Sequence, residues 1–162
     1  LGLKLRMHEQ LMAAYPSVRV KKKYQLKREL MMIGYTTIGV SNMESACEFY
    51  AALLGELGGK QLFGMDRIEF FGTDPGAPMI AVCVPYDEKA PESGNGTMIA
   101  IPAGDPAGVD KMYAKAIELG ATDEGAPGPR NPAFYGAYVR DADGNKLCFY
   151  VADVTQISFN AN

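Results

Sequence analysis

Histidine is almost absent from this sequence of 162 residues, in which His8 is the only one. Imidazole is the usual general base at neutral pH and the commonest metal-binding side chain. The chain beyond His8 therefore lacks the group that a Ser-His-Asp triad, a His-rich zinc site or a two-histidine iron site requires. There is also no GxxxxGK[ST] pattern and no GxGxxG after a strand, which argues against the common nucleotide-binding loops.

Cysteine is scarce and long apolar runs are missing. The three cysteines make an odd count without a CxxC pair. This usage does not suit a disulfide framework and favours a reducing compartment, so we expect a cytoplasmic protein. No stretch approaches the ~20 apolar residues of a membrane span. With 48% hydrophobic and 22% charged residues, the composition is typical of a folded globular protein.

The net charge of −3 conceals a strong asymmetry. Residues 1–31 carry eight basic and two acidic side chains, whereas residues 32–162 carry eight basic and seventeen acidic ones. This contrast predicts a basic N-terminal extension (1–31), a body (32–152) and a short C-terminal tail (153–162).

The basic extension fits an arm for nucleic acid, an amphipathic helix at a membrane surface, or a leader-like or vector-derived segment without a role in function. We favour the last of these. The acidic body argues against nucleic acid as the main partner, and we expect no membrane partner.

The body reads as a strand, a helix and three strands, written twice. In the first unit (32–84) we predict strands over 35–40, 60–63, 67–71 and 79–84, with a helix over 43–57. In the second unit (96–151) we predict strands over 97–101, 121–124, 135–140 and 146–151, with a helix over 106–119. The fold class is thus α+β, with two tandem βαβββ units forming a curved, mostly antiparallel sheet around a cavity and helices outside.

Local signals support these boundaries. Ser41 to Glu44 has the pattern of a capping box, and Asp105-Pro106 supplies an N-cap and a first-turn proline. The run Asp141 to Asn145 predicts a tight turn between the last two strands. The segment 125–132, with three prolines and two glycines, reads as a loop.

Three stretches of the body are similar to a known superfamily. They are residues 33–41 (IGYTTIGVS), residues 48–55 (EFYAALLG) and residues 139–147 (VRDADGNKL). In this order they resemble the vicinal oxygen chelate superfamily, which includes glyoxalase I, bleomycin-resistance proteins and extradiol dioxygenases. The resemblance covers residues 32–152 and implies the two-unit fold and a homodimer. It does not specify a function, because this fold hosts lyases, dioxygenases, epimerases and binding proteins.

The resemblance also places the metal-ligand positions of the superfamily, which are usually His and Glu. Here they fall on Tyr35, Cys83, Met98 and Cys148, with Ile80 as a second alignment for the second position. None is His or Glu, so we expect neither a metal nor another cofactor. Soft sulfur ligands would suit copper(I), and two thiolates could support zinc. We favour an apolar lining, since buried cysteine usually behaves as a small hydrophobe.

Strand alternation predicts which side chains face the cavity. These are Tyr35, Thr37, Cys83, Met98, Ala100, Cys148 and Tyr150. Aromatic residues near the loops could stack on a planar ligand or belong to the core; they are Phe63, Phe70, Phe71, Phe134, Tyr135 and Tyr138. Arg130 could clamp an anion or be an exposed connector residue. The predicted ligand-binding set is therefore Tyr35, Thr37, Cys83, Met98, Arg130, Tyr135, Tyr138, Cys148 and Tyr150.

These features predict a protein that binds a small aromatic or cationic molecule, the cation being favoured by the acidic body. The alternative is a glyoxalase-like lyase or isomerase, or a dioxygenase-type enzyme, with an atypical site. Its weak candidate for a general base is Glu69, which would need to point inward together with Arg67. Because charged residues are rarely buried, we favour both of them facing water. A third reading is a structural or regulatory dimer module fused to the basic segment.

Overall fold

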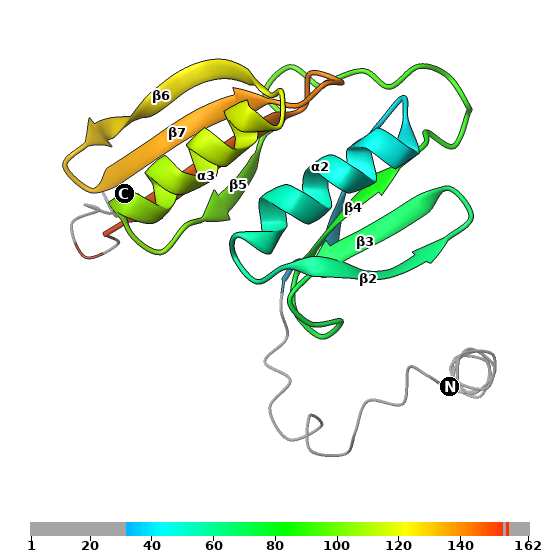
Figure 1. Cartoon of the computed structure of the whole chain (residues 1–162), viewed down its shortest axis with the longest axis horizontal. Coiled ribbons are helices and arrows are strands. Elements are labelled where there is room, and N and C mark those ends of the chain that lie inside the picture. The colour runs from blue at the N-terminus through cyan, green and yellow to red at the C-terminus, as the bar shows by residue number, and fades with distance from the viewer. Residues whose placement is uncertain (1–31, 154, 156–162) are drawn as a thin grey trace, which may run out of the picture. The chain divides into compact units, whose positions relative to one another are not determined.

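The computed structural model describes residues 32–153 and 155, and the basic extension predicted for residues 1–31 lies outside them. Residues from Ile33 onward form one unit. The elements of its first half are β1 (Tyr35–Gly39), α2 (Met43–Gly55), β2 (Lys60–Met65), β3 (Ile68–Gly72) and β4 (Met79–Cys83). Those of its second half are β5 (Ile99–Pro102), α3 (Pro106–Glu118), β6 (Thr122–Asn131), β7 (Phe134–Arg140) and β8 (Lys146–Ala152). The predicted double βαβββ order is confirmed (Figure 1).

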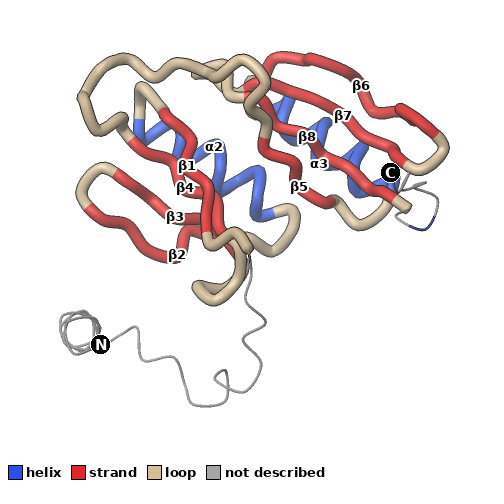
Figure 2. The backbone as a smooth tube through the Cα atoms, turned by 180° about the vertical axis from the view of Figure 1, so that it is seen from behind, coloured by secondary structure: helices blue, strands red, loops and turns tan. Residues whose placement is uncertain are grey.

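Each half builds its own four-stranded sheet. The strand orders are β1-β4-β3-β2 and β5-β8-β7-β6, so the two sheets follow the same plan. Only the first pair of each sheet, β1 with β4 and β5 with β8, is parallel, and the other pairs are antiparallel. In Figure 2, α2 lies behind the first sheet and α3 behind the second, so each helix covers one face of its sheet and leaves the other face open.

The helices begin where short polar side chains satisfy their first backbone N–H groups. The side chain of Asn42 accepts from the Ser45 N–H (3.0 Å), so the cap of α2 is Asn42 and the capping box predicted from Ser41 is wrong. Asp105 caps α3 through the Gly108 N–H (2.7 Å), with Pro106 in the first turn as predicted.

The predicted loop at 125–132 is wrong except at its last residue, because residues 125–131 belong to the long strand β6. Pro127 and Pro129 lack the N–H that an interior strand needs, but β6 is an edge strand with one neighbour only. Three register shifts against β7 accommodate the prolines and glycines. The segment is therefore held on the sheet, where its side chains can take part in a site.

One core joins the two halves. Ile38, Val82 and Phe71 of the first half and Val139 and Phe149 of the second belong to the same buried cluster. Along each strand, these buried residues alternate with residues that face away from the helices. The sequence predicted this alternation for half-buried strands.

Hydrogen bonds tie the halves together at the turn between β7 and β8. The buried Tyr50 hydroxyl of α2 donates to Asp141 Oδ2 (2.7 Å). Asn145 Nδ2 donates to the Gly39 carbonyl (3.0 Å), and the Ser41 N–H donates to Asp143 Oδ1 (3.0 Å). The predicted turn is confirmed, and it holds β1 and α2 in addition to reversing the chain.

Candidate ligand-binding faces

The face of the first sheet that α2 leaves open is rich in aromatic side chains. We call it the first open face; it consists of Tyr35, Thr37, Phe63, Met65, Ile68, Phe70, Met79, Ala81 and Cys83. The rings of Phe63 and Phe70 stack with centroids 4.5 Å apart, and Tyr35 meets Phe70 edge-on at 5.2 Å. Tyr35 is 53% exposed and Phe63 is 40% exposed. This face therefore presents an aromatic cluster of which two rings are accessible.

The corresponding face of the second sheet combines aromatic rings with cations. We call it the second open face; it consists of Ala100, Pro102, Glu124, Arg130, Phe134, Tyr138, Arg140, Lys146, Cys148 and Tyr150. Phe134 and Tyr150 stack with centroids 5.3 Å apart and an interplanar angle of 2°. The Tyr138 ring lies under two cations, Arg130 at 5.3 Å and Lys146 at 5.1 Å.

The thiol of Cys148 lies between these groups. It is fully buried and stands opposite Tyr138 in the β7–β8 register. Burial raises the pKa of the thiol, and the Tyr138 hydrogen bond and the charges of Arg130 and Lys146 offset this only in part. The thiol therefore remains protonated at neutral pH and is not an activated nucleophile.

Glu124 organises the cations at one end of this face. It pairs with Lys146 Nζ (2.9 Å) and with Arg140 Nε. Hydrogen bonds from Lys146 and Arg140 hold the pKa of this carboxyl below its usual range. Arg130 has no such partner: among residues 32–153 its side chain donates to the Ala126 carbonyl (2.6 Å) and makes no ion pair.

The structure divides most of the predicted ligand-binding residues between the open faces of the two sheets. Tyr35, Thr37 and Cys83 share the first open face, and Arg130, Tyr138, Cys148 and Tyr150 share the second. Met98 precedes β5 and is exposed.

Two predicted residues lie on the helix-covered sides of the sheets instead. The Tyr135 hydroxyl donates to Asp110 of α3 (2.9 Å), which places the ring against that helix. Glu69 accepts a hydrogen bond from Gln61 (2.8 Å) and contributes to raising the pKa of Cys47 on α2. Neither side chain is therefore positioned with the open-face residues.

Sequence reasoning missed Lys146 and Arg140. Both belong to the second open face because they alternate with residues that had been assigned to it, Cys148 on β8 and Tyr138 on β7. The same period of two could have identified them. They were overlooked because they border the Asp141 to Asn145 turn, where charged residues are ordinary.

The residues at the four metal-ligand positions of the superfamily do not fit a His/Glu metal site. Tyr35 pairs with Met79 while Cys83 pairs with Gly39, four residues further along the parallel strands. At ~3.3 Å per residue, the Cα atoms of Tyr35 and Cys83 are therefore about 13 Å apart in the direction of the strands. No group of three or more His, Cys, Asp or Glu side chains that could hold a metal occurs in the described part of the chain.

Comparison with known proteins agrees with this fold. The family model of the glyoxalase/bleomycin resistance protein/dioxygenase superfamily matches residues 32–149. The chain belongs to this superfamily. The crystal structure of a superfamily protein from Albidiferax ferrireducens T118 is 32% identical, with a TM-score of 0.68 over 74% of this chain and 98% of that one. No curated protein matches the chain.

More distant members of the superfamily show the same fold. A family enzyme from Burkholderia phytofirmans PsJN is 19% identical, with a TM-score of 0.60 over 72% of this chain and 95% of that one. A member from Sphaerobacter thermophilus is 21% identical, with a TM-score of 0.56 over 75% of this chain and 97% of that one. These two similarities support the architecture alone, because function varies widely within one fold.

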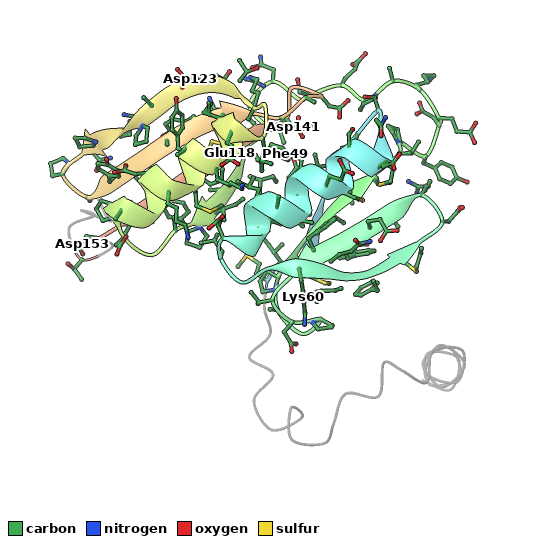
Figure 3. All side chains as sticks on the ribbon, viewed as in Figure 1. Phe49, Lys60, Glu118, Asp123, Asp141 and Asp153 are labelled. Atoms are coloured by element: carbon green, nitrogen blue, oxygen red, sulfur yellow. The ribbon has the colours of Figure 1, made fainter. Side chains whose placement is uncertain are left out.

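The surface of the described residues has two hollows. One borders the end of the first open face, where it is lined by Gly39 of β1 and by residues of the loop after β4. The other lies at the junction of the halves, where Phe49 and Asp141, both labelled in Figure 3, are among the lining residues. The described helices include none that is long and apolar enough to cross a membrane.

Proposed function

We propose that the protein binds a small planar molecule on its open sheet faces. The observation that carries this proposal is the parallel stack of Phe134 and Tyr150 beside Tyr138 on the second open face. Aromatic rings that are only partly buried offer large, rigid surfaces for a flat ligand at a low entropic cost. The residues at the metal-ligand positions of the superfamily are not the usual His and Glu, which supports binding over metal-dependent lyase or dioxygenase chemistry.

The working form that we propose is a cytoplasmic homodimer without nucleic-acid or membrane partners. Tyr35, Phe63 and Met65 expose between 40% and 53% of their surface on the first open face. A second copy that covered this face would remove the apolar surface from water. The three cysteines are all unpaired, in keeping with a reducing compartment.

Isothermal titration with 2-naphthol, a neutral planar probe, tests the proposal. We expect saturable binding with one probe per chain, and a Tyr150→Ser variant that binds about fivefold more weakly because one stacking partner is lost. The matched control is Tyr86→Ser, which changes a tyrosine that is 86% exposed and lies outside both open faces.

Chromatography of the probe after overnight incubation separates binding from turnover. Recovery of unchanged 2-naphthol supports a binding protein, whereas a new product would show an enzyme. If the wild-type protein gives no binding at millimolar probe, or if both variants weaken it equally, the proposal fails.

A further inference from the structure

The positive charge of the body is concentrated on the second open face. Residues 32–162 have only eight basic side chains against seventeen acidic ones. Three of the eight, Arg130, Arg140 and Lys146, lie on this face. Glu124 pairs with two of them, Arg140 and Lys146. An acidic protein therefore presents a locally positive surface next to its aromatic stack.

Arg130 is held in place by features that leave its guanidinium available. Its Cζ lies 5.3 Å from the centroid of the Tyr138 ring. A Cβ built on Gly125 would come within 3.4 Å of its Nη2, and one built on Gly128 within 3.3 Å of its Nη1. The two glycines thus leave room for the guanidinium to lie along β6 and over the ring.

The donor inventory of Arg130 points to an anionic partner. A guanidinium has five N–H donors in a planar fork. Within the described residues, Arg130 uses one acceptor, the Ala126 carbonyl. The remaining donors match a carboxylate in bidentate geometry. Arg140 and Lys146 instead share Glu124, so they set the local potential without taking the ligand's charge themselves.

The aromatic stack and the cations are spaced for one ligand. Lys146, Cys148 and Tyr150 follow each other at two-residue intervals on β8, which is ~7 Å per step on one face of a strand. Tyr138, which stands opposite Cys148, lies between the charged and the aromatic ends. A molecule with a fused-ring body and one carboxylate can reach from the stack to Arg130.

We propose that the second open face selects planar organic anions, with the carboxylate bound by Arg130 and the ring system resting on the stack of Phe134 and Tyr150 beside Tyr138. This inference rests on the proposed function and names its ligand class. An anionic ligand thus takes the place of the cationic ligand that the net charge of the whole body favours. The reason is that a bound ligand interacts more strongly with charges a few ångströms away than with distant charges that salt screens.

Three probes of nearly equal shape test the charge preference on the full chain. They are 2-naphthoate, neutral 2-naphthamide and (2-naphthyl)methylammonium, each titrated by calorimetry at 50 and 200 mM salt. We expect 2-naphthoate to bind at least tenfold more tightly than the amide, the ammonium compound to bind most weakly, and the preference for the anion to shrink at the higher salt concentration.

Variants assign the preference to Arg130. Arg130→Met should weaken 2-naphthoate at least tenfold and leave 2-naphthamide within about twofold, while Arg130→Lys should recover only part of the loss because it lacks the planar fork. The matched control is Arg67→Met. Arg67 also lies over a tyrosine, Tyr86 at 5.2 Å, and donates to one carbonyl, that of Val84, but it is remote from the second sheet in the strand order.

The outcomes separate this inference from the proposed function. Equal binding of the three probes, or equal losses in Arg130→Met and Arg67→Met, would overturn the anion selection and leave planar-molecule binding standing. Tighter binding of the ammonium probe would do the same. Absence of binding by all three probes, in a protein that circular dichroism shows to be folded, would overturn both.

Discussion

Removing the hydroxyl of Tyr50 tests how firmly the two halves are joined. Tyr50 is 1% exposed, and its hydroxyl donates to Asp141 Oδ2 at 2.7 Å, while Asp141 itself is 7% exposed. Hydrogen bonds to charged groups contribute about 1.5–3 kcal/mol. In Tyr50→Phe, Asp141 Oδ2 still accepts a hydrogen bond from Asn145 Nδ2 (2.9 Å), so the carboxylate keeps a hydrogen-bond partner. We therefore expect the free energy of unfolding to fall by about 2 kcal/mol, toward the lower end of this range.

The hydrogen bond between Tyr50 and Asp141 should also make the stability difference between wild type and Tyr50→Phe depend on pH, which a purely steric effect would not do. Burial, followed by the nearby charge of Asp141 and the hydrogen bond to it, raises the pKa of Tyr50 far above its usual value of 10.0. The unfolded chain loses the phenolic proton above pH 10 while the folded chain keeps it. This stabilising contribution is thus complete below pH 10 and declines as the pH rises above it.

The assay is urea denaturation of the wild type and Tyr50→Phe between pH 7 and 10.5. At neutral pH the variant should lose about 2 kcal/mol, equivalent to a Tm lower by ~4–8 °C for a domain of this size. Between pH 9 and 10.5, the difference in free energy of unfolding between the two proteins should narrow by about 0.8 kcal/mol, because Tyr50 ionises in the unfolded wild type. The control Tyr86→Phe, at an exposed position, should change stability by less than about 0.5 kcal/mol.

Two results would refute this reasoning. A loss in Tyr50→Phe no larger than that of the control would mean that the hydrogen bond contributes little to the junction. A full loss with a difference that stays constant up to pH 10.5 would mean that Tyr50 ionises as readily in the folded chain as in the unfolded one, so that its proton is not held toward Asp141.

Three further predictions concern the open faces. Phe63→Glu should shift the protein from dimer to monomer in light scattering after size exclusion; a dimer that persists would place the interface elsewhere. Gly125→Ala should weaken 2-naphthoate several-fold, because the new Cβ would lie 3.0 Å from Tyr138 Cδ2 and close to the Arg130 guanidinium, and it should also lower stability, because the φ of +157° suits glycine. Unchanged affinity would show that the arginine needs no such room. Cys148 should escape iodoacetamide at pH 7.5 in the native protein and react fully in urea, as peptide mass mapping would show; rapid native labelling would contradict its burial.

The sequence predicted the architecture because the repeated pattern is carried by many residues. Alternation in the strands and a stripe in each helix recur in both halves, so single errors do not change the result. The errors occurred where one local signal competed with a longer-range one. Proline at 127 and 129 reads as a loop signal, yet an edge strand accepts it. Ser41 matches a capping box, yet its N–H is taken by Asp143 of the other half.

The candidate site was less predictable, since side-chain direction near strand ends depends on register and bulges. Tyr135 lies on the α3 side because its pairing with Val151 is three positions, an odd number, from the open-face pairing of Tyr138 with Cys148. The position of Arg130 over Tyr138 depends on the register shifts of β6, which no local pattern encodes. Its role was therefore left open between a clamp and a connector.

The stretch that carries the superfamily resemblance most clearly has a structural role in this chain. In the turn after β7, Asp141 accepts from Tyr50, from the Asp143 N–H and from Asn145, and Asn145 reaches the Gly39 carbonyl. These contacts position the two halves and do not involve the open faces. Similarity in this stretch therefore reports how the units are joined. Arg130 and Tyr138 lie on the second open face, outside the contacts of the turn, so they, rather than the turn, are the positions where the proposed ligand selection should be tested.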